Sequence, residues 1–500
     1  MLPLVRMSKP VISTIGELKK SGYTSKSIKE ELRDNLIQSL RDGIQVFDGI
    51  LGYEFSVIPE VQTAILAGHN INFLGLRGQA KTKLARMITR LLDEWTPVVF
   101  GSELNDDPLN PLSKYALNLI AENGDETPIE WMHRSDRYVE KLATPDVTVA
   151  DLIGDLDPIK AANLRVGYQD ERAIHFGLIP RSNRCIFVIN ELPDLQARIQ
   201  VSLFNILQEG DIQIRGFKLR LPLDIQFIFT ANPEDYTNRG SIVTPLKDRI
   251  GSQILTHYPE DKLIAASITA SEAKLSDSQK REIEIPVSMR NMIENISFLA
   301  RKSEFVDQKS GVSARLGISI LEAVVAAAER RKIIHGEKNT TLRVGDLYHA
   351  IQAINGKIEM VYEGEQEGPY NVAVNLIIQS IREEFDQIFG GISKIKMRKI
   401  GETDQYSQII RWFEEGNFLQ LLRDDSDLSY HKTLEQVEGL KKILPAGEKD
   451  NYFLMDLALH GLAANSRISN TQISGTFHFG DLVNSMMKMT SEEDDEESFS

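Results

Sequence analysis

The sequence predicts an α/β fold in which a mostly parallel sheet has helices on both faces and is followed by helical regions. Short, nearly continuous apolar runs at residues 71–74, 97–100, 185–189, 225–229 and 253–255 alternate with helical or loop segments. Strands that are buried on both faces of a parallel sheet show this pattern. After residue 261 the pattern becomes helical, with an apolar stripe through Leu316, Ile320, Ala323, Val324 and Ala327.

The chain has 500 residues, of which 42% are hydrophobic and 26% are charged. This is the composition of an ordinary globular protein with several domains. We expect a helical N-terminal lead-in at 1–49, an α/β domain at 50–260 and a second, helical domain at 261–357. A helical C-terminal region at 358–490 and an acidic, disordered tail at 491–500 complete the prediction.

Composition excludes several classes of protein. The net charge of -15 argues against sequence-independent binding to nucleic acid, which needs a basic surface. No apolar run is long enough to cross a bilayer, and the N-terminus lacks an extended apolar region with a cleavage site, so we expect a cytoplasmic protein without a membrane span. The single cysteine, Cys185, lies in a predicted strand and excludes a disulfide framework or a cysteine-rich metal site.

The segment 75–82, Gly-Leu-Arg-Gly-Gln-Ala-Lys-Thr, lies between an apolar run and an amphipathic stretch. A loop between a strand and a helix can wrap its backbone N–H groups around a polyphosphate. We therefore predict ATP binding, with Lys81 on the β- and γ-phosphates and Thr82 on Mg²⁺. An ordinary glycine turn before a surface lysine is the alternative. The candidate nucleotide-binding residues are Gly75, Gly78, Gln79, Ala80, Lys81 and Thr82.

Ala80 departs from the usual pattern G-x-x-x-x-G-K-[ST], which has glycine at this position. We expect its methyl group to crowd the loop or to require a slightly different backbone.

A second group of polar residues follows the apolar run at 185–189. Glu191 would emerge at the carboxyl edge of the sheet, where the glycine-rich loop also lies, and we predict that it orients or deprotonates the attacking water. Asn190 occupies the usual place of a magnesium-linked aspartate and contributes an amide oxygen without negative charge. The alternative is that Asn190 and Glu191 only cap the next helix, near Asp194.

Further candidates lie downstream. Asn232 ends the run at 225–229 and is placed to touch the γ-phosphate or the attacking water, although Asn-Pro is also a common turn. Arg249 and Arg315 are candidates for stabilising charge on the γ-phosphate, and Arg239 is a rival for a role on a neighbouring subunit. For each arginine, a surface ion pair is the competing interpretation.

The order of these motifs resembles the AAA+ ATPases, in the branch that contains the ATPase subunit of magnesium chelatase and the MoxR proteins. The resemblance covers about residues 47–353. Besides the phosphate loop (Walker A), it rests on the segments 141–145, 152–162 and 177–184, and on a predicted hairpin around Gly216 that is similar to a family insertion.

The resemblance implies that Glu191 is the catalytic glutamate, Asn232 the first sensor and Arg315 the second sensor, within a helical lid at 261–357. It implies an arginine finger at Arg249 or Arg239. It also implies a homo-oligomeric ring, usually a hexamer, with ATP between neighbours. Family members act as chaperone-like motors on a protein client, often with a partner that has a von Willebrand factor A domain. Ala80 and Asn190 depart from the family pattern, which leaves the rate of turnover open.

We therefore expect a motor that hydrolyses ATP to remodel or activate a protein partner, including by metal insertion. The alternatives are a nucleotide-gated scaffold with little turnover and a true magnesium chelatase subunit, which the residues after 357 make less attractive. An enhancer-binding transcriptional activator is disfavoured, because the Gly-Ala-Phe-Thr-Gly-Ala loop and a recognisable DNA-reading helix pair are missing from the sequence.

Overall fold

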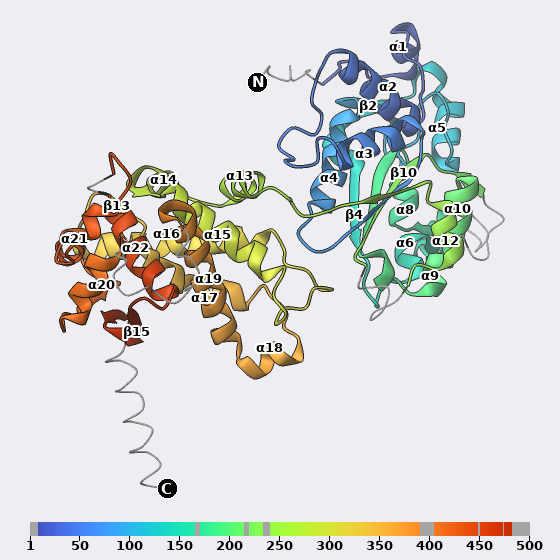
Figure 1. Ribbon diagram of the computed structural model, residues 1–500. Helices are drawn as coiled ribbons and strands as arrows, with labels where there is room; N and C mark the ends of the chain where they lie inside the picture. Colours follow the sequence, from blue (N-terminus) through green and yellow to red (C-terminus); the bar gives the residue numbers. More distant parts are fainter. Residues whose placement is uncertain are drawn as a thin grey trace. The chain divides into compact units, whose positions relative to one another are not determined.

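The computed structural model describes residues 9–165, 171–214, 220–233, 241–390, 405–448, 451–473 and 475–482 (Figure 1). The chain divides into two compact units, residues 1–258 and 259–500. Arg239, the hairpin tip at 215–219 and the acidic tail at 491–500 lie outside the described residues. Within the described ranges, no helix combines the length and the apolar character needed to cross a membrane.

The first unit contains a five-stranded sheet in which all neighbouring strands are parallel. This confirms the predicted parallel sheet, and the observed strands match the predicted runs at 71–74, 185–189, 225–229 and 253–255. In the register, Leu74 lies opposite both Ala231 and Leu255, so these strands end at one common edge. The strand order is β11 (Ser252–Leu255), β1 (Ile71–Leu74), β10 (Ile225–Ala231), β7 (Cys185–Asn190) and β4 (Tyr138–Leu142).

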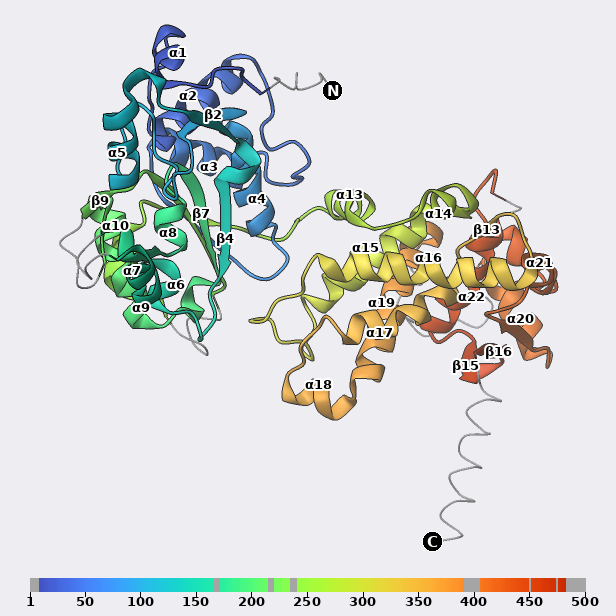
Figure 2. The same cartoon turned by 180° about the vertical axis from the view of Figure 1, so that it is seen from behind.

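Helices pack on both faces of this sheet (Figure 2). One face is covered by α2 (Ile28–Arg41), α3 (Val57–Leu66) and α4 (Lys81–Met87). The other face is covered by α8 (Leu178–Arg181), α9 (Ala197–Ser202), α10 (Phe204–Glu209) and α12 (Thr244–Arg249). The unit also contains α1 (Ile15–Lys20), α5 (Lys114–Asn123), α6 (Val149–Leu152) and α7 (Pro158–Leu164).

One predicted strand lies elsewhere. The apolar run at 97–100 falls mainly in β2 (Trp95–Val99), which pairs antiparallel with β3 (Ile129–His133) in a separate two-stranded sheet. The fifth strand of the main sheet is β4, which none of the predicted apolar runs covers. As an edge strand it pairs on one side only, and its sequence Tyr-Val-Glu-Lys-Leu places Glu140 and Lys141 among apolar residues. A search for continuous apolar runs therefore misses it.

Two short antiparallel pairs complete the strands of the first unit. The strands β5 (Gly154–Leu156) and β6 (Ile174–Phe176) form one pair. The strands β8 (Asp211–Gln213) and β9 (Arg220–Pro222) form the other, which confirms the predicted hairpin.

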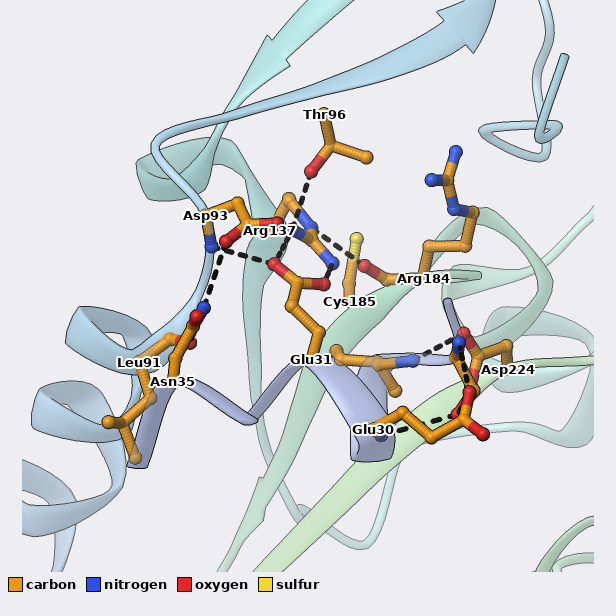
Figure 3. A network of polar contacts seen from close by, with 12 residues as sticks. Glu30, Glu31, Asn35, Leu91, Asp93, Thr96, Arg137, Arg184, Cys185 and Asp224 are labelled. Carbon is orange, nitrogen blue, oxygen red and sulfur yellow. Dashed lines mark hydrogen bonds and ion pairs between the residues drawn. The ribbon is translucent and has the colours of Figure 1, made fainter. Parts of the chain in front are cut away.

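A buried ion pair joins α2 to the sheet. The guanidinium of Arg137 donates to both carboxylate oxygens of Glu31, each at 2.6 Å, and the two side chains are 1% and 8% exposed. Figure 3 shows two further donations from Arg137, to the hydroxyl of Thr96 and to the backbone oxygen of Arg184. The helix α2, from the expected lead-in, is thus part of the α/β core.

Cys185 lies within the same region of Figure 3 and is 1% exposed. Burial raises the pKa of its thiol to about 12, so the thiol stays protonated at neutral pH. Cys185 is thus a small residue of the core.

The second unit is mainly helical, as predicted, and the apolar stripe through Leu316, Ile320 and Val324 is fully buried on α16. One continuous core extends from Ala273 to Phe479, so the expected lid and C-terminal region share it. The helices are α13 (Lys262–Glu272), α14 (Asp277–Glu282), α15 (Val287–Ala300), α16 (Arg315–His335), α17 (Ile351–Asn355), α18 (Tyr362–Glu367), α19 (Pro369–Phe389), α20 (Ser407–Glu414), α21 (Asp427–Leu434) and α22 (Tyr452–Ala464).

The second unit also contains strands that the sequence pattern did not indicate. A parallel pair consists of β12 (Ile283–Glu284) and β13 (Thr340–Thr341). A three-stranded antiparallel sheet has the order β14 (Leu419–Leu422), β16 (Thr476–Gly480) and β15 (Ser469–Ile473).

Candidate nucleotide site at the sheet edge

The loop from Gly75 to Ala80 follows β1 and ends at the first residue of α4. A Cβ added at Gly75 would overlap the side-chain oxygens of Thr256 and Gln79, so only glycine fits there. Gly78 has a φ of 72°, in the left-handed region that glycine adopts without strain. The loop is thus a close-packed cradle whose shape depends on these glycines, as a polyphosphate site requires.

Residues that follow β11 and precede α3 hold the loop in place. The hydroxyl of Thr256 donates to Oε1 of Gln79 at 2.7 Å. The hydroxyl of Tyr53 lies 3.0 Å from the backbone oxygen of Gln79 and 2.8 Å from that of His257, placed to donate to either. Burial raises the pKa of Tyr53 to about 12, so this hydroxyl keeps its proton. Gln79 is therefore a structural anchor of the loop.

Ala80 adopts a left-handed backbone, with φ 57° and ψ 16°, directly before α4. Residue 80 thus has the backbone conformation that glycine prefers, rather than a different one adapted to alanine. A left-handed conformation costs an alanine about 1–2 kcal/mol. The loop keeps its shape at this position in spite of the methyl group, at some cost in stability.

Lys81 is 8% exposed, and its ammonium group lies inside the loop that precedes it. Nζ donates to the backbone oxygens of Gly75 and Leu76 and, at 2.5 Å, to Oδ1 of Asn232. A buried ammonium group attracts an anion strongly. The edge of the sheet therefore holds the positive charge of Lys81, in contact with two backbone oxygens and the Asn232 amide.

Asn232 links Lys81 to Glu191. Its Nδ2 donates to Oε2 of Glu191 at 2.8 Å, while its Oδ1 accepts from Lys81. Glu191 and Asn232 directly follow β7 and β10, and Lys81 begins α4 after the loop that follows β1; these three strands are neighbours in the sheet. The structure therefore brings together the three side chains that the sequence placed at this edge.

Glu191 has φ 56° and ψ 50° and precedes a short 3-10 helix, Leu192–Asp194. Its side chain makes no capping hydrogen bond to that helix and contacts Asn232 instead. A left-handed non-glycine residue costs about 1–3 kcal/mol, and such strain is often found at functional sites. This geometry does not support the alternative that Glu191 only caps the next helix.

Asn190 is buried at the end of β7 and lies within a chain of hydrogen bonds. The hydroxyl of Thr230 lies 3.1 Å from its Oδ1, and its Nδ2 donates to Oε1 of Glu140. Glu140 comes from the edge strand β4 and was not among the sequence-based candidates. The signal available in the sequence was a carboxylate two residues before the end of a short strand that mixes apolar and charged residues.

The candidate arginines Arg249 and Arg315 lie on other helices. Arg249 ends α12, where it donates to Gln208 and to the backbone oxygen of Pro245 and lies 4.9 Å from the ring of Phe204. Arg315 begins α16 in the second unit. Their proposed roles stay predictions.

The residues at the edge fit a magnesium ion that is bound together with a nucleotide. Thr82, half-buried in the first turn of α4, and Asn190 offer hydroxyl and amide oxygens, which are hard ligands of the kind Mg²⁺ takes. Across the described part of the chain, no group of three or more His, Cys, Asp or Glu side chains is arranged to hold a metal. The phosphates and water would therefore complete the coordination.

The chain is similar in sequence to proteins of known families. No protein-family model matches the chain. The magnesium-chelatase 38 kDa subunit of Cereibacter sphaeroides is 27% identical over 224 residues, which is 43% of this chain and 59% of that subunit. The chain thus spans less than two thirds of that relative. The transcriptional regulatory protein HoxA of Cupriavidus necator is 21% identical over 346 residues, which is 67% of this chain and 69% of HoxA.

Among solved structures, the complex between subunits BchI and BchD of magnesium chelatase contains a chain that is 19% identical. The match covers 63% of this chain and 97% of that one, with a TM-score of 0.34. The five-stranded parallel sheet, the loop at Gly75–Ala80 and the magnesium-chelatase relative agree with one another. The chain is thus a distant relative of the magnesium-chelatase 38 kDa subunit, which agrees with the resemblance to the AAA+ ATPases that the sequence motifs indicate.

Proposed function

We propose that the chain binds ATP together with Mg²⁺ at the sheet edge and hydrolyses it to ADP and phosphate. The observation that carries this proposal is the hydrogen-bonded series Lys81, Asn232 and Glu191, which joins the phosphate loop to a carboxylate across three strand ends. A phosphate-binding lysine and a water-activating carboxylate must lie within reach of the same phosphoryl group.

Each residue of the series has a distinct role in the proposed reaction. Lys81 exchanges its loop and Asn232 contacts for oxygens of the β- and γ-phosphates. Glu191 accepts a proton from the water whose oxygen attacks the γ-phosphorus, and Asn232 holds that water or the phosphate by its amide. Magnesium, when bound, neutralises charge on the phosphates, and Thr82 and Asn190 would hold it.

We further propose that the chain works as an assembled motor on a protein partner. The support is its relationship to a magnesium-chelatase subunit and, in the solved complex, the association of BchI with BchD. In such an assembly Arg249 or Arg239 would act on the nucleotide of a neighbouring copy, and Arg315 would sense the nucleotide. A hexameric ring and a client, including one with a von Willebrand factor A domain, belong to the same proposal.

Two substitutions test the proposed reaction. Glu191→Gln keeps the size and loses the basicity, so kcat for ATP hydrolysis should fall by about 10²–10⁴-fold while ATP still binds. Lys81→Ala should weaken ATP binding itself. Calorimetric titration and a phosphate-release assay measure the two effects. Unchanged ATP affinity in Lys81→Ala would contradict the proposal, and a wild type with negligible turnover but normal binding would favour the nucleotide-gated scaffold.

Size-exclusion chromatography with and without ATP tests the assembly. The Glu191→Gln variant loaded with ATP should elute as an oligomer and retain its partner in a pull-down, because the bound state persists. A monomer under both conditions would contradict the ring.

A further inference from the structure

The end of β7 has an amide where this kind of site usually has a carboxylate, so the negative charge expected beside the magnesium is missing from Asn190 itself. The neighbouring strand supplies one. Leu142 of β4 lies opposite Asn190 in the register, and Glu140 stands two residues earlier, on the same face of the sheet. From there its Oε1 accepts the hydrogen bond of Asn190 Nδ2.

This contact fixes which way the amide of Asn190 points. An ionised carboxylate only accepts hydrogen bonds, so the Asn190 nitrogen must face Glu140 and the oxygen must face away. The contacts of the Asn190 oxygen agree with this orientation, because the hydroxyl of Thr230 lies 3.1 Å from Oδ1. The Thr230 hydroxyl oxygen in turn accepts the backbone N–H of Glu191 at 3.2 Å. Glu140 therefore orients the amide oxygen that is placed to serve the magnesium, and polarises it.

The second oxygen of Glu140 connects to the helix of the phosphate loop. Its Oε2 accepts from Arg86 at 3.0 Å and from the hydroxyl of Tyr138 at 3.0 Å. Arg86 stands one turn after Thr82 on α4, so both side chains lie on one face of that helix. The Arg86 side chain is 66% exposed, and an ion pair this open to water neutralises little of the carboxylate charge.

We propose that Glu140 is a positioning residue of the magnesium site, where it supplies, through Asn190, the negative charge that the strand end lacks. The inference rests on the proposed nucleotide binding and extends it to a residue of the edge strand. In this proposal two residues take the place of one acidic ligand: the amide of Asn190 faces the metal, and the carboxylate of Glu140 contacts that amide from the other side. Partners behind metal ligands commonly change metal affinity by about 10–100-fold.

The experiment measures the binding of a non-hydrolysable ATP analogue, first in excess EDTA and then across a magnesium titration. For Glu140→Gln, we expect affinity in EDTA to match the wild type and the magnesium midpoint to rise by about tenfold. The swapped variant Glu140→Gln with Asn190→Asp exchanges carboxylate and amide across the same contact, and should restore the midpoint. Tyr138→Phe is the matched control, because it removes a hydrogen bond to Glu140 without changing its charge, and should leave the midpoint unchanged.

The outcomes separate this inference from the proposed function. A wild type that binds no analogue even with magnesium would overturn the proposed function and the inference with it. Normal binding with an unshifted midpoint in Glu140→Gln would overturn the inference alone. A loss of analogue affinity of Glu140→Gln in EDTA would also overturn the inference alone. A shift of the magnesium midpoint in Tyr138→Phe as large as that in Glu140→Gln would do the same, because either result shows that Glu140 has a structural role. If Glu140→Gln does not fold, the swapped variant decides, and a raised midpoint there contradicts the inference.

Discussion

Two groups of polar residues, one at the sheet edge of the first unit and one in the core of the second, differ in how they are buried. In the first unit, Lys81, Asn232 and Glu191 bond to one another at the open edge of a sheet, and Asn232 and Glu191 keep partial exposure. In the second unit, Arg331 and Asp346 form an ion pair with side chains 0% and 2% exposed, inside a helical core. The first arrangement is partly exposed, so a ligand can replace its protein contacts, whereas the second is closed off from solvent.

This difference separates a candidate site from structural polarity. Charges at a sheet edge can exchange their protein partners for those of a ligand with little loss of solvation, while a sealed pair can only be broken at full cost. The comparison predicts that substitutions in the second unit act on stability, and that those at the edge act on nucleotide or magnesium binding.

The largest expected effect comes from breaking the sealed pair. Arg331→Met leaves Asp346 buried without its ionic partner, which should lower the free energy of unfolding by about 3–5 kcal/mol. The adjacent Arg330→Met is the matched control, because Arg330 pairs with Asp424 through side chains that are 58% and 54% exposed. An exposed pair contributes about 0–1 kcal/mol.

Urea unfolding followed by circular dichroism measures both variants. Equal losses in Arg331→Met and Arg330→Met would remove the basis for calling the first pair structural. A selective loss of nucleotide affinity in folded Arg331→Met would break the comparison altogether.

A second prediction concerns pH. Glu294 is 4% exposed in the core of the second unit, and burial raises the pKa of its carboxyl above the ordinary value of 4.5, although Thr269 donates to it at 2.6 Å. The folded state therefore holds this proton more tightly than the unfolded chain. Its contribution to stability is full below pH 4.5 and is lost as the pH rises through the raised pKa.

Glu294→Gln removes this titration and keeps an oxygen for Thr269. The variant should be more stable than the wild type at neutral pH, and the difference should vanish below pH 4.5. Unfolding curves at several pH values measure it, with the exposed Glu304→Gln as a control that should show no such pH dependence. A destabilised Glu294→Gln at neutral pH would indicate that the carboxylate is needed in its ionised form.

Sequence reasoning recovered the edge of the first unit because its signals are local. Lys81, Glu191 and Asn232 each follow a short apolar strand, and parallel strands end together, so their meeting follows from the order of the chain. Glu140 was missed because its strand β4 is an edge strand that mixes apolar and charged residues, and because its partner Asn190 lies 50 residues away. No local pattern encodes that register.

The second unit was less predictable for a related reason. Its helices follow from the apolar stripe on α16, but the pairing of β14 with β16 joins segments more than 50 residues apart. Arg331 and Asp346 are ordinary helical residues in the sequence, and only the packing reveals that they are sealed. Long-range contacts of this kind depend on the whole core, which single-segment patterns do not contain.

The smallest expected effect comes from replacing an alanine by glycine in each unit. This substitution should change the free energy of unfolding in opposite directions in the two units. Ala80→Gly relieves the left-handed backbone, worth about 1–2 kcal/mol, against about 0.4–1 kcal/mol of added entropy in the unfolded chain. The net result is a gain of about 0–1.6 kcal/mol. Ala326→Gly, at an exposed position inside α16, should instead cost about 1 kcal/mol, because alanine favours the right-handed helix there. Thermal unfolding of both variants measures the signs. A loss in Ala80→Gly would mean that the free loop does not hold residue 80 in the left-handed conformation, and that only a bound phosphate imposes it.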